Sequence, residues 1–549
     1  MPFATTGSIF DRQSNRIQEV LNKSLKVFLA GLDPVWRDSV VTSQGVGNSG
    51  ELGRDLKITK LYMGSLTGVI DPGRVYNDQD LYGDTTTALG SLMHTQNTNQ
   101  AYPSPREGPN ATAYRLAVPM RSLVTNLMIT LGEKQADATP ALIDQVVAPK
   151  LTAFARNMAH TLCNYWYLSQ NSSYRLCTIS NAVCTSATGQ SRITFNPANF
   201  ETHRFTRGQR VDILHSGGQR SNDSAATSTR SSRHNLIVEN VDALQNKVTL
   251  ICSNNSLFAA IGVGGGMLDT NAAAIGTSDA TVATAMNGLQ VVYANTNLAA
   301  GGAAGSNTFV GIAGINSWLK NGNETNTNGT KLLGNEADST DFIDVNDRPE
   351  FKSFKYDVAG ALTEYNLKRY LQRVHSAFEP LGNTIDTLIA SEGVWTAYEA
   401  QKIGQYRIDR TNRAASITNE GQADGFSFSF EGKTYKGSTS RYVEGGTLYG
   451  IKLGGKNWKK YVPPSPAGLS KMSQADAYVP FEFVAGALTG TSTNQLPMFH
   501  INGSDNLVTQ ASQMPGRIRM QLVPDQVNGM KLVGITEDRV YMPTSGNIA

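Results

Sequence analysis

The chain has 549 residues, of which 40% are hydrophobic and 17% are charged, and its formal net charge is +3. An average soluble domain has roughly 45–50% apolar and about 25% charged residues, so Gly, Ser, Thr, Asn and Gln make up the difference. This composition indicates many strands and long loops, and it excludes a collagen, a coiled coil and a wholly disordered chain. The 48 basic and 45 acidic side chains argue against a dedicated phosphate-tracking protein, which normally carries a larger or more clustered basic excess, so we expect any nucleic acid contact to be diffuse.

The cysteines and the hydrophobic runs define the expected compartment. Cys163, Cys177, Cys184 and Cys252 contain no CxxC pair and favour buried free thiols over a disulfide framework. Residues 1–12 lack the apolar region of a secretory signal, and no run approaches the length of a membrane span. We therefore expect a soluble protein, made in a reducing compartment and without a membrane partner.

The first part of the chain predicts a helix followed by a projecting hairpin. Residues 14–31 have a helical apolar face consisting of Ile17, Val20, Leu21, Leu25, Phe28 and Leu29. A Gly-rich run at 45–53 reads as a hinge or extended arm. Strand-like stretches at 56–70 and 114–131 enclose a polar insert at 71–112, which is longer than ordinary connections.

The strongest helix signal begins at Thr139, a good N-cap, with Pro140 at the first helical position. The apolar residues that recur at helical spacing, and form its predicted core face, are Ile143, Val147, Leu151, Phe154, Met158 and Leu162. The run ends near Asn171 and would reach roughly 45 Å, with Pro149 as a kink. It is either the rigid backbone of an elongated subunit or an ordinary core helix.

Residues 185–345 differ from the preceding segment in their pattern of apolar and polar side chains. Residues 207–214, 236–241 and 247–253 alternate apolar and polar side chains, which predicts a small β-barrel or sandwich inserted into the chain. After it, Leu367, Leu371, Val374 and Phe378 define a helix face. A strand at 384–390, a second helix capped by Ser391 and further strands follow, with Asn528-Gly529 as a hairpin turn before 530–535.

The sequence contains no convincing catalytic motif. Gly432-Lys433-Thr434 ends like a P-loop, but Ser427 occupies the position of the required glycine and no helix follows. The glycines at 262–266 favour a flexible loop, and the acids Asp338, Asp341, Asp344 and Asp347 lack calcium-loop spacing. The seven histidines show no ligand spacing. We therefore expect a structural protein, not an enzyme, with no cofactor and no metal.

One basic cluster remains, and its members are Arg204, Arg207, Arg210, Arg220, Arg230 and Arg233, against Asp212 and Asp223. These side chains could contact phosphate or an acidic neighbour. Within an insertion, the pattern is more typical of a solvated or inter-subunit face.

Three stretches resemble a known family when taken in their order along the chain. They are ATPALIDQVVAPKLTAFARNMAHTLCNYWYLS (138–169), TLIASEGVWTAYEAQK (387–402) and SFEGKTYKGSTSRYVEGGTLYGIKLGGKNWKKY (429–461). They are similar to the spine helix, the axial-domain core and a set of strands in the major capsid protein of tailed double-stranded-DNA bacteriophages. That protein has the Hong Kong 97-type fold, shared with encapsulins and herpesvirus shell floors.

The resemblance implies an α+β fold with six parts. They are an N-terminal arm (1–55), an extended β-hairpin loop (56–131), a peripheral domain with the spine helix (132–184), an inserted β-rich domain (185–345), an axial domain (346–470) and a C-terminal β segment of the peripheral domain (471–549). It also implies the function. The chain would assemble into pentamers and hexamers, which form the icosahedral head shell around packaged viral DNA.

The extended loop would lie across a neighbouring subunit through the larger side chains of its polar insert. These residues are Tyr76, Leu81, Tyr82, Leu89, Leu92, Met93 and Tyr102, together with Arg74 and Arg106. Some relatives cross-link through a loop lysine, but residues 71–112 contain none, and Lys57 and Lys60 lie at the base of the loop. We therefore expect non-covalent or decoration-protein reinforcement, and no fused scaffolding segment.

The implied partners are other copies of the chain, scaffolding, portal and cement proteins, and packaged DNA in non-specific proximity. The implied location is the virion head, assembled in the bacterial host cytoplasm. Two alternatives stay open. A β-rich phage tail or surface-binding protein would explain the Gly-, Asn- and Thr-rich strands but not the spine helix, and an unrecognised hydrolase is disfavoured by the motif search.

Overall fold

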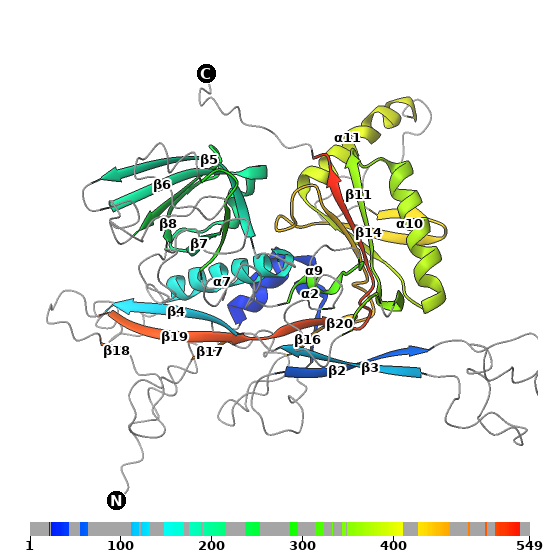
Figure 1. Ribbon diagram of the computed structural model, residues 1–549, viewed down its shortest axis with the longest axis horizontal. Coiled ribbons are helices and arrows are strands. Elements are labelled where there is room, and N and C mark those ends of the chain that lie inside the picture. The colour runs from blue at the N-terminus through cyan, green and yellow to red at the C-terminus, as the bar shows by residue number, and fades with distance from the viewer. Residues whose placement is uncertain are drawn as a thin grey trace, which may run out of the picture.

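The computed structural model describes residues 21, 23–42, 55–63, 111–119, 122–130, 148–168, 175–187, 190–214, 236–252, 286–294, 313–322, 332, 343–346, 349–409, 427–461, 481–483, 500–501 and 511–537. Within these ranges the chain combines helices and strands. Figure 1 shows a β-barrel and a larger sheet covered by helices, with a long helix between the barrel and a layer of extended strands.

The long helix is α7 (Ala148–Leu168), and its buried face lies in the largest apolar core. Trp166 is fully buried on that face. Its ring meets Trp458 edge to face at 5.1 Å and Trp36 at 6.3 Å. Edge-to-face contacts of this kind stabilise a core beyond the area they bury. The same core includes a three-stranded sheet, ordered β1 (Val40–Thr42), β16 (Trp458–Tyr461) and β20 (Gln521–Pro524).

The N-terminal segment packs on this core as two helices. Residues 23–32 are helical, and Leu21, Leu25 and Leu29 are fully buried, which confirms the described part of the predicted apolar face. Residues 14–20 of that prediction lie outside the described residues. A second helix, α2 (Pro34–Asp38), follows directly, with Asp33 as its N-cap.

The barrel is closed by six strands in the order β10-β5-β6-β9-β8-β7. Their bounds are β5 (Arg175–Ala187), β6 (Gln190–Pro197), β7 (Arg210–Leu214), β8 (Leu236–Asp242), β9 (Lys247–Cys252) and β10 (Gln290–Tyr293). Alternate side chains fill the interior, where Phe195 and Phe205 meet edge to face at 6.0 Å. A 3-10 helix, η2 (Ala198–Arg204), follows β6.

The barrel does not coincide with the block predicted at 185–345. Strand β5 begins at Arg175, so the barrel takes in residues on both sides of position 185. At the other end, the short helix α9 (Ile315–Trp318) is buried in the core of α7 and not in the barrel. The sequence did not reveal β5, because its alternating apolar and polar side chains directly follow polar residues that are typical of the end of a helix.

The second large body is a six-stranded sheet in the order β11-β21-β15-β12-β14-β13. Its strands are β11 (Phe354–Gly360), β12 (Thr387–Ala390), β13 (Ser427–Phe430), β14 (Lys433–Thr439), β15 (Leu448–Ile451) and β21 (Met530–Ile535). Helix α10 (Glu364–Phe378) buries the predicted apolar face, which consists of Leu367, Leu371, Val374 and Phe378. Helix α11 (Glu392–Asp409) contributes Val394, Trp395 and Tyr398 to the same core.

A two-stranded ribbon lies beside these bodies. Strands β2 (Asp55–Met63) and β3 (Ala111–Pro119) pair antiparallel along their whole length. The next strand, β4 (Ser122–Thr130), pairs instead with β19 (Ala511–Arg519). β19 also pairs with β17 (Phe481–Phe483) and β18 (His500–Ile501).

Two predictions about strands were wrong in detail. The stretch 114–131 is two strands that belong to different sheets, because β3 ends at Pro119, which has no N–H to continue a ladder. Asn528-Gly529 is not a hairpin turn, since the strands on either side of it, β20 and β21, lie in different sheets. The Asn528 side chain donates instead to the carbonyls of Glu350 and Lys352.

Candidate functional site

The predicted inter-subunit residues lie outside the described residues. They are Tyr76, Leu81, Tyr82, Leu89, Leu92, Met93, Tyr102, Arg74 and Arg106. The ribbon nevertheless fixes the ends of the segment that carries them. Met63 lies opposite Ala111 in the register of β2 and β3, so the chain leaves and re-enters the described structure at one end of the ribbon. Val118, near the other end, is fully buried in the core of α7.

The predicted core face of the long helix divides in a similar way. Leu151, Met158 and Leu162 are buried, and Phe154 packs against the same core with partial exposure. Ile143 and Val147 lie outside the described residues. Pro149 is the second residue of α7. A kink there would depend on the helical turn before it, which also lies outside the described residues, so the predicted kink stays a prediction.

Asp33 joins the N-terminal helices to α7. Its carboxylate accepts hydrogen bonds from the backbone N–H groups of Val35 and Trp36 at 3.0 and 3.2 Å. It also accepts one from the Tyr167 hydroxyl at 2.7 Å. Burial raises the pKa of Asp33, and these hydrogen bonds partly oppose the rise. The Asp33-Pro34 pair is itself an N-cap signal, because an aspartate directly before a proline is typical of a helix start.

A second buried contact joins α7 to the six-stranded sheet through α9. Asn316 donates to the Tyr167 carbonyl at 2.9 Å. Its side-chain oxygen accepts from the Tyr449 hydroxyl at 2.9 Å and from Lys531 at 2.8 Å. These polar groups satisfy one another inside the core, so they fix the position of the sheet relative to α7. No periodic pattern in the sequence indicated them.

The predicted basic face of the insertion is divided by the fold. Arg204 is 1% exposed and pairs with Glu201 at 3.0 Å, and it donates to the Leu176 carbonyl at 2.9 Å. It is therefore an internal clamp between η2 and β5, and not part of a solvated face. Arg207 and Arg210 are exposed, whereas the predicted members Arg220, Arg230 and Arg233 lie outside the described residues.

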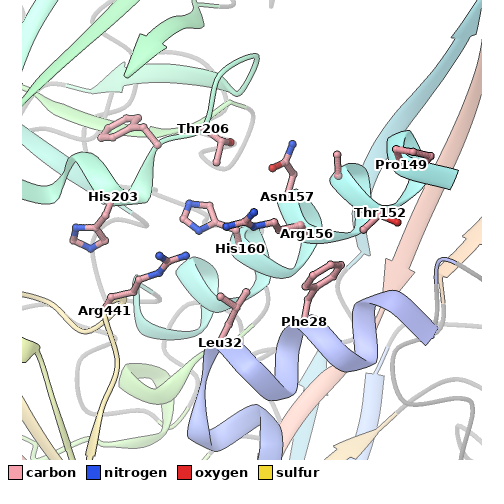
Figure 2. Close-up of a pocket in the computed structure, with 12 residues that line it drawn as sticks. Phe28, Leu32, Pro149, Thr152, Arg156, Asn157, His160, His203, Thr206 and Arg441 are labelled. Atoms are coloured by element: carbon pink, nitrogen blue, oxygen red, sulfur yellow. The ribbon is translucent and has the colours of Figure 1, made fainter. Parts of the chain in front are cut away.

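A pocket of about 940 Å³ opens where the N-terminal helix, α7 and the segment after η2 meet. Figure 2 shows the side chains that line it. They are Phe28, Leu32, Pro149, Thr152, Ala153, Arg156, Asn157, His160, His203, Phe205, Thr206 and Arg441. The part of the lining that belongs to the described residues contains two arginines and two histidines but no carboxylate. One wall, formed by Phe28 and Leu32, is apolar.

His160 lies at the base of this pocket and is buried. Its Nδ1 is 3.0 Å from the Tyr442 hydroxyl. Burial lowers the pKa of His160 to about 4. The carbonyl of Arg204 opposes this change, and the positive charges of Arg441 and Arg156 add to it. The imidazole is therefore neutral at neutral pH, which the sequence could not indicate because the arginines come from distant segments.

An aromatic and basic surface covers one edge of the six-stranded sheet. Phe354 and Tyr356 of β11 stack at 6.3 Å, and Tyr370 of α10 lies 4.9 Å from the Tyr356 ring. Arg373 lies 5.8 Å from the Phe354 ring, and on the outer face of α10 the exposed Arg369 lies 5.6 Å from the Tyr365 ring. Tyr365 is 69% exposed and Tyr356 is 43% exposed. Among the described strands, β11 pairs only with β21, so it forms an edge of this sheet.

The motif candidates do not assemble into a catalytic centre in the part of the chain that the structure describes. Glu431 and Gly432 form the tight turn between β13 and β14, with φ of 50° and 74°, so the P-loop reading stays rejected. His375 is hydrogen-bonded to Tyr435 within the core of the six-stranded sheet. No group of three or more His, Cys, Asp or Glu residues in the described ranges could hold a metal ion. None of the described helices is long and apolar enough to cross a bilayer.

Comparisons with known proteins give likenesses to solved structures only. No protein-family model and no curated protein matches the chain. The chain is similar to the cyanophage A-1(L) capsid, with a TM-score of 0.34 and 10% identity over 91% of each chain. It is similar to a structure from Mycobacterium phage Patience, with a TM-score of 0.30 and 8% identity over 96% of this chain and 90% of that one.

A further likeness is to the SrpI encapsulin complex of Synechococcus elongatus PCC 7942. The TM-score is 0.19 and the identity 12%, over 35% of this chain. The match covers 56% of the encapsulin chain, less than two thirds of its length.

Proposed function

We propose that this chain is a structural capsid protein with a Hong Kong 97-type fold, and that it assembles into pentamers and hexamers of an icosahedral head shell around packaged DNA. On this proposal it is not an enzyme and needs no cofactor. Its partners are other copies of itself, together with scaffolding, portal and cement proteins. Its place is the virion, after assembly in the bacterial host cytoplasm.

The observation that carries the proposal is the ribbon of β2 and β3. It pairs over nine positions, from Asp55 opposite Pro119 to Met63 opposite Ala111, and shares no ladder with another described strand. A two-stranded ribbon is marginally stable in water by itself. Val118 near one end of the ribbon is buried in the subunit's own core, so the end at Met63 and Ala111 is the part that a neighbouring subunit in a shell would support.

The order of the parts also supports the proposal. An N-terminal helical segment, a ribbon, the long helix α7 and a six-stranded sheet with α10 and α11 succeed one another along the chain. The terminal strand β19 then returns to pair with β4. This is the order that the resemblance of residues 138–169, 387–402 and 429–461 implies, with the barrel as the inserted domain.

The buried contacts suit a subunit that must carry load without changing shape. Asp33, Asn316 and Arg204 each bond to a residue far away in the chain, which is Val443 in the case of Arg204. The subunit can then meet its neighbours as a rigid unit, and a heterologous contact repeated around an axis closes into a ring. Shell reinforcement is non-covalent on this proposal, since residues 71–112 contain no lysine.

Electron microscopy of the purified full-length protein tests the proposal. We expect closed shells or rings of five and six subunits, formed by the chain alone or with a scaffolding protein. Fibres would favour the β-rich tail or surface-binding protein instead. Dispersed monomers at high concentration under every assembly condition would contradict both assembling functions.

A further inference from the structure

The pocket beside α7 combines positive charge with an apolar wall. Arg156 projects from α7, and Arg441 from the segment between β14 and β15. Figure 2 shows both side chains directed toward the pocket, close to His160. The two arginines belong to segments that only the fold brings together. The charge of the pocket is therefore a feature of the folded subunit and not of a basic run in the sequence.

Within the described residues, these two charges have no counter-ion. Neither Arg156 nor Arg441 forms an ion pair there, and none of the described Asp or Glu residues lines the pocket. Arg441 instead donates to the Tyr442 hydroxyl at 3.2 Å and lies 5.2 Å from that ring. Two guanidinium groups on one hollow, each with free donors, match the geometry of an oxyanion.

The volume of the pocket and its apolar wall indicate which class of ligand it could bind. A volume of about 940 Å³ is at the upper end of the roughly 300–1,000 Å³ typical of ligand pockets, and far exceeds a bare inorganic ion. Phe28 and Leu32 form a wall that a bare ion cannot use, whereas an apolar side chain can pack on it. Asn157 and Thr206 add neutral hydrogen-bonding groups at the rim.

We propose that this pocket binds an acidic peptide segment, with a carboxylate between Arg156 and Arg441 and an apolar side chain against Phe28 and Leu32. The segment belongs to a partner protein, whose negative charge complements the two arginines. The inference concerns the single subunit, so it does not depend on the proposed shell function and can fail or hold separately from it.

The pKa of His160 should change when a peptide binds in the pocket, so it can be used to detect binding. Its pKa is lowered by burial and further by the charges of Arg441 and Arg156. A carboxylate placed between these arginines offsets the arginine contribution, and the pKa of His160 then rises. A peptide bound elsewhere on the surface leaves this pKa unchanged.

Titration calorimetry at low salt tests the proposal on the full-length subunit. The probe is the acetylated and amidated tetrapeptide Glu-Leu-Glu-Leu, and the control peptide is Gln-Leu-Gln-Leu. We expect binding of the acidic peptide only. Arg156→Gln and Arg441→Gln should each weaken it about ten-fold. Arg369→Gln, which removes an exposed arginine on α10, should leave the affinity unchanged.

Proton NMR of the histidine rings supplies the second measurement. The His160 resonance should titrate at a higher pH in the presence of saturating acidic peptide. Equal affinity for the two peptides, or equal affinity in the Arg156→Gln and wild-type proteins, would overturn the proposal. Binding of inorganic phosphate without binding of the acidic peptide would also overturn it, because the pocket would then be a simple anion site.

Discussion

Asp33 and Tyr167 are distant in the chain, yet one hydrogen bond between them fixes the N-terminal helices on α7. The same carboxylate caps α2. It therefore has two roles, one local and one tertiary. Local capping could be predicted from the Asp33-Pro34 pair, because it depends on adjacent residues alone. The contact with Tyr167 could not, since it depends on how two helices meet.

Asp33→Ala removes both roles. Loss of the cap costs about 1 kcal/mol, and the buried Tyr167 hydroxyl left without its acceptor costs about 1–3 kcal/mol more. We therefore expect the free energy of unfolding, measured by urea denaturation of the subunit, to fall by about 2–4 kcal/mol. Asp38→Ala is the matched control, because Asp38 is exposed in the same short helix. An equal effect of the two substitutions would contradict the role of Asp33.

His160 should make subunit stability depend on pH. Its pKa is about 4 in the folded chain and about 6.5 when unfolded. Between these values the unfolded state binds more protons, so stability falls as the pH drops through this window and is level above it. From pH 7.5 to pH 5 this residue should cost about 2 kcal/mol. His160→Gln should flatten the unfolding profile, whereas Tyr442→Phe, which keeps the imidazole, should not.

Helix faces were the most predictable elements, because helical spacing records which side chains are buried. Leu367, Leu371, Val374 and Phe378 repeat at that spacing and form the buried face of α10. Strands were harder to predict from the sequence. The alternation at 207–214 and 236–241 correctly indicated β7 and β8, but alternation gives no pairing partner. The division of 114–131 between two sheets therefore needed the structure.

Met158 tests the packing of α7 as an element. Its side chain is 4% exposed within the core that contains Trp36 and Trp166. Met158→Asp buries a carboxylate that has no partner there, so the free energy of unfolding should fall by several kcal/mol. Asn157→Asp is the control, because Asn157 is exposed at the adjacent position of the same helix. Thermal denaturation followed by circular dichroism measures both, and similar melting temperatures would contradict the face assignment.

At the scale of the whole molecule, the six-stranded sheet has two different edges. The β11 edge carries the exposed Tyr356, and the neighbouring helix α10 carries the exposed Tyr365 and Arg369 on its outer face. At the other edge, the turn after β13 carries Glu431, whose side chain is 44% exposed, and Lys433 and Lys436 of β14 lie beside it. Two chemically different edges on one subunit would suit head-to-tail contact between copies in the proposed shell, and such contact forms rings when the rotation closes.

Removal of the exposed rings should therefore weaken assembly without unfolding the subunit. Tyr and Arg side chains are enriched among the residues that dominate interfaces. We expect Tyr356→Ser combined with Tyr365→Ser to raise the protein concentration required for assembly by about ten-fold or more, measured by light scattering. Leu244→Ser is the control, because Leu244 is an equally exposed apolar residue on the barrel. If the control raised the threshold as much, the β11 edge would not be the contact surface.

The segment between β2 and β3 gives the most direct test of the shell geometry. Met63 and Ala111 face each other at the end of the ribbon, so residues 64–110 connect the two strands there, and we propose that this segment contacts a neighbouring subunit. Arg74 and Arg106 are trypsin sites within this segment. Because a neighbour that covers them blocks the protease, trypsin should cut both sites more slowly in assembled particles than in dissociated subunits. Cleavage after the exposed Arg207 of the barrel serves as the internal standard for protease activity. If the ratio of loop to barrel cleavage were the same in both states, the segment would make no contact between subunits, and the ribbon would need another explanation.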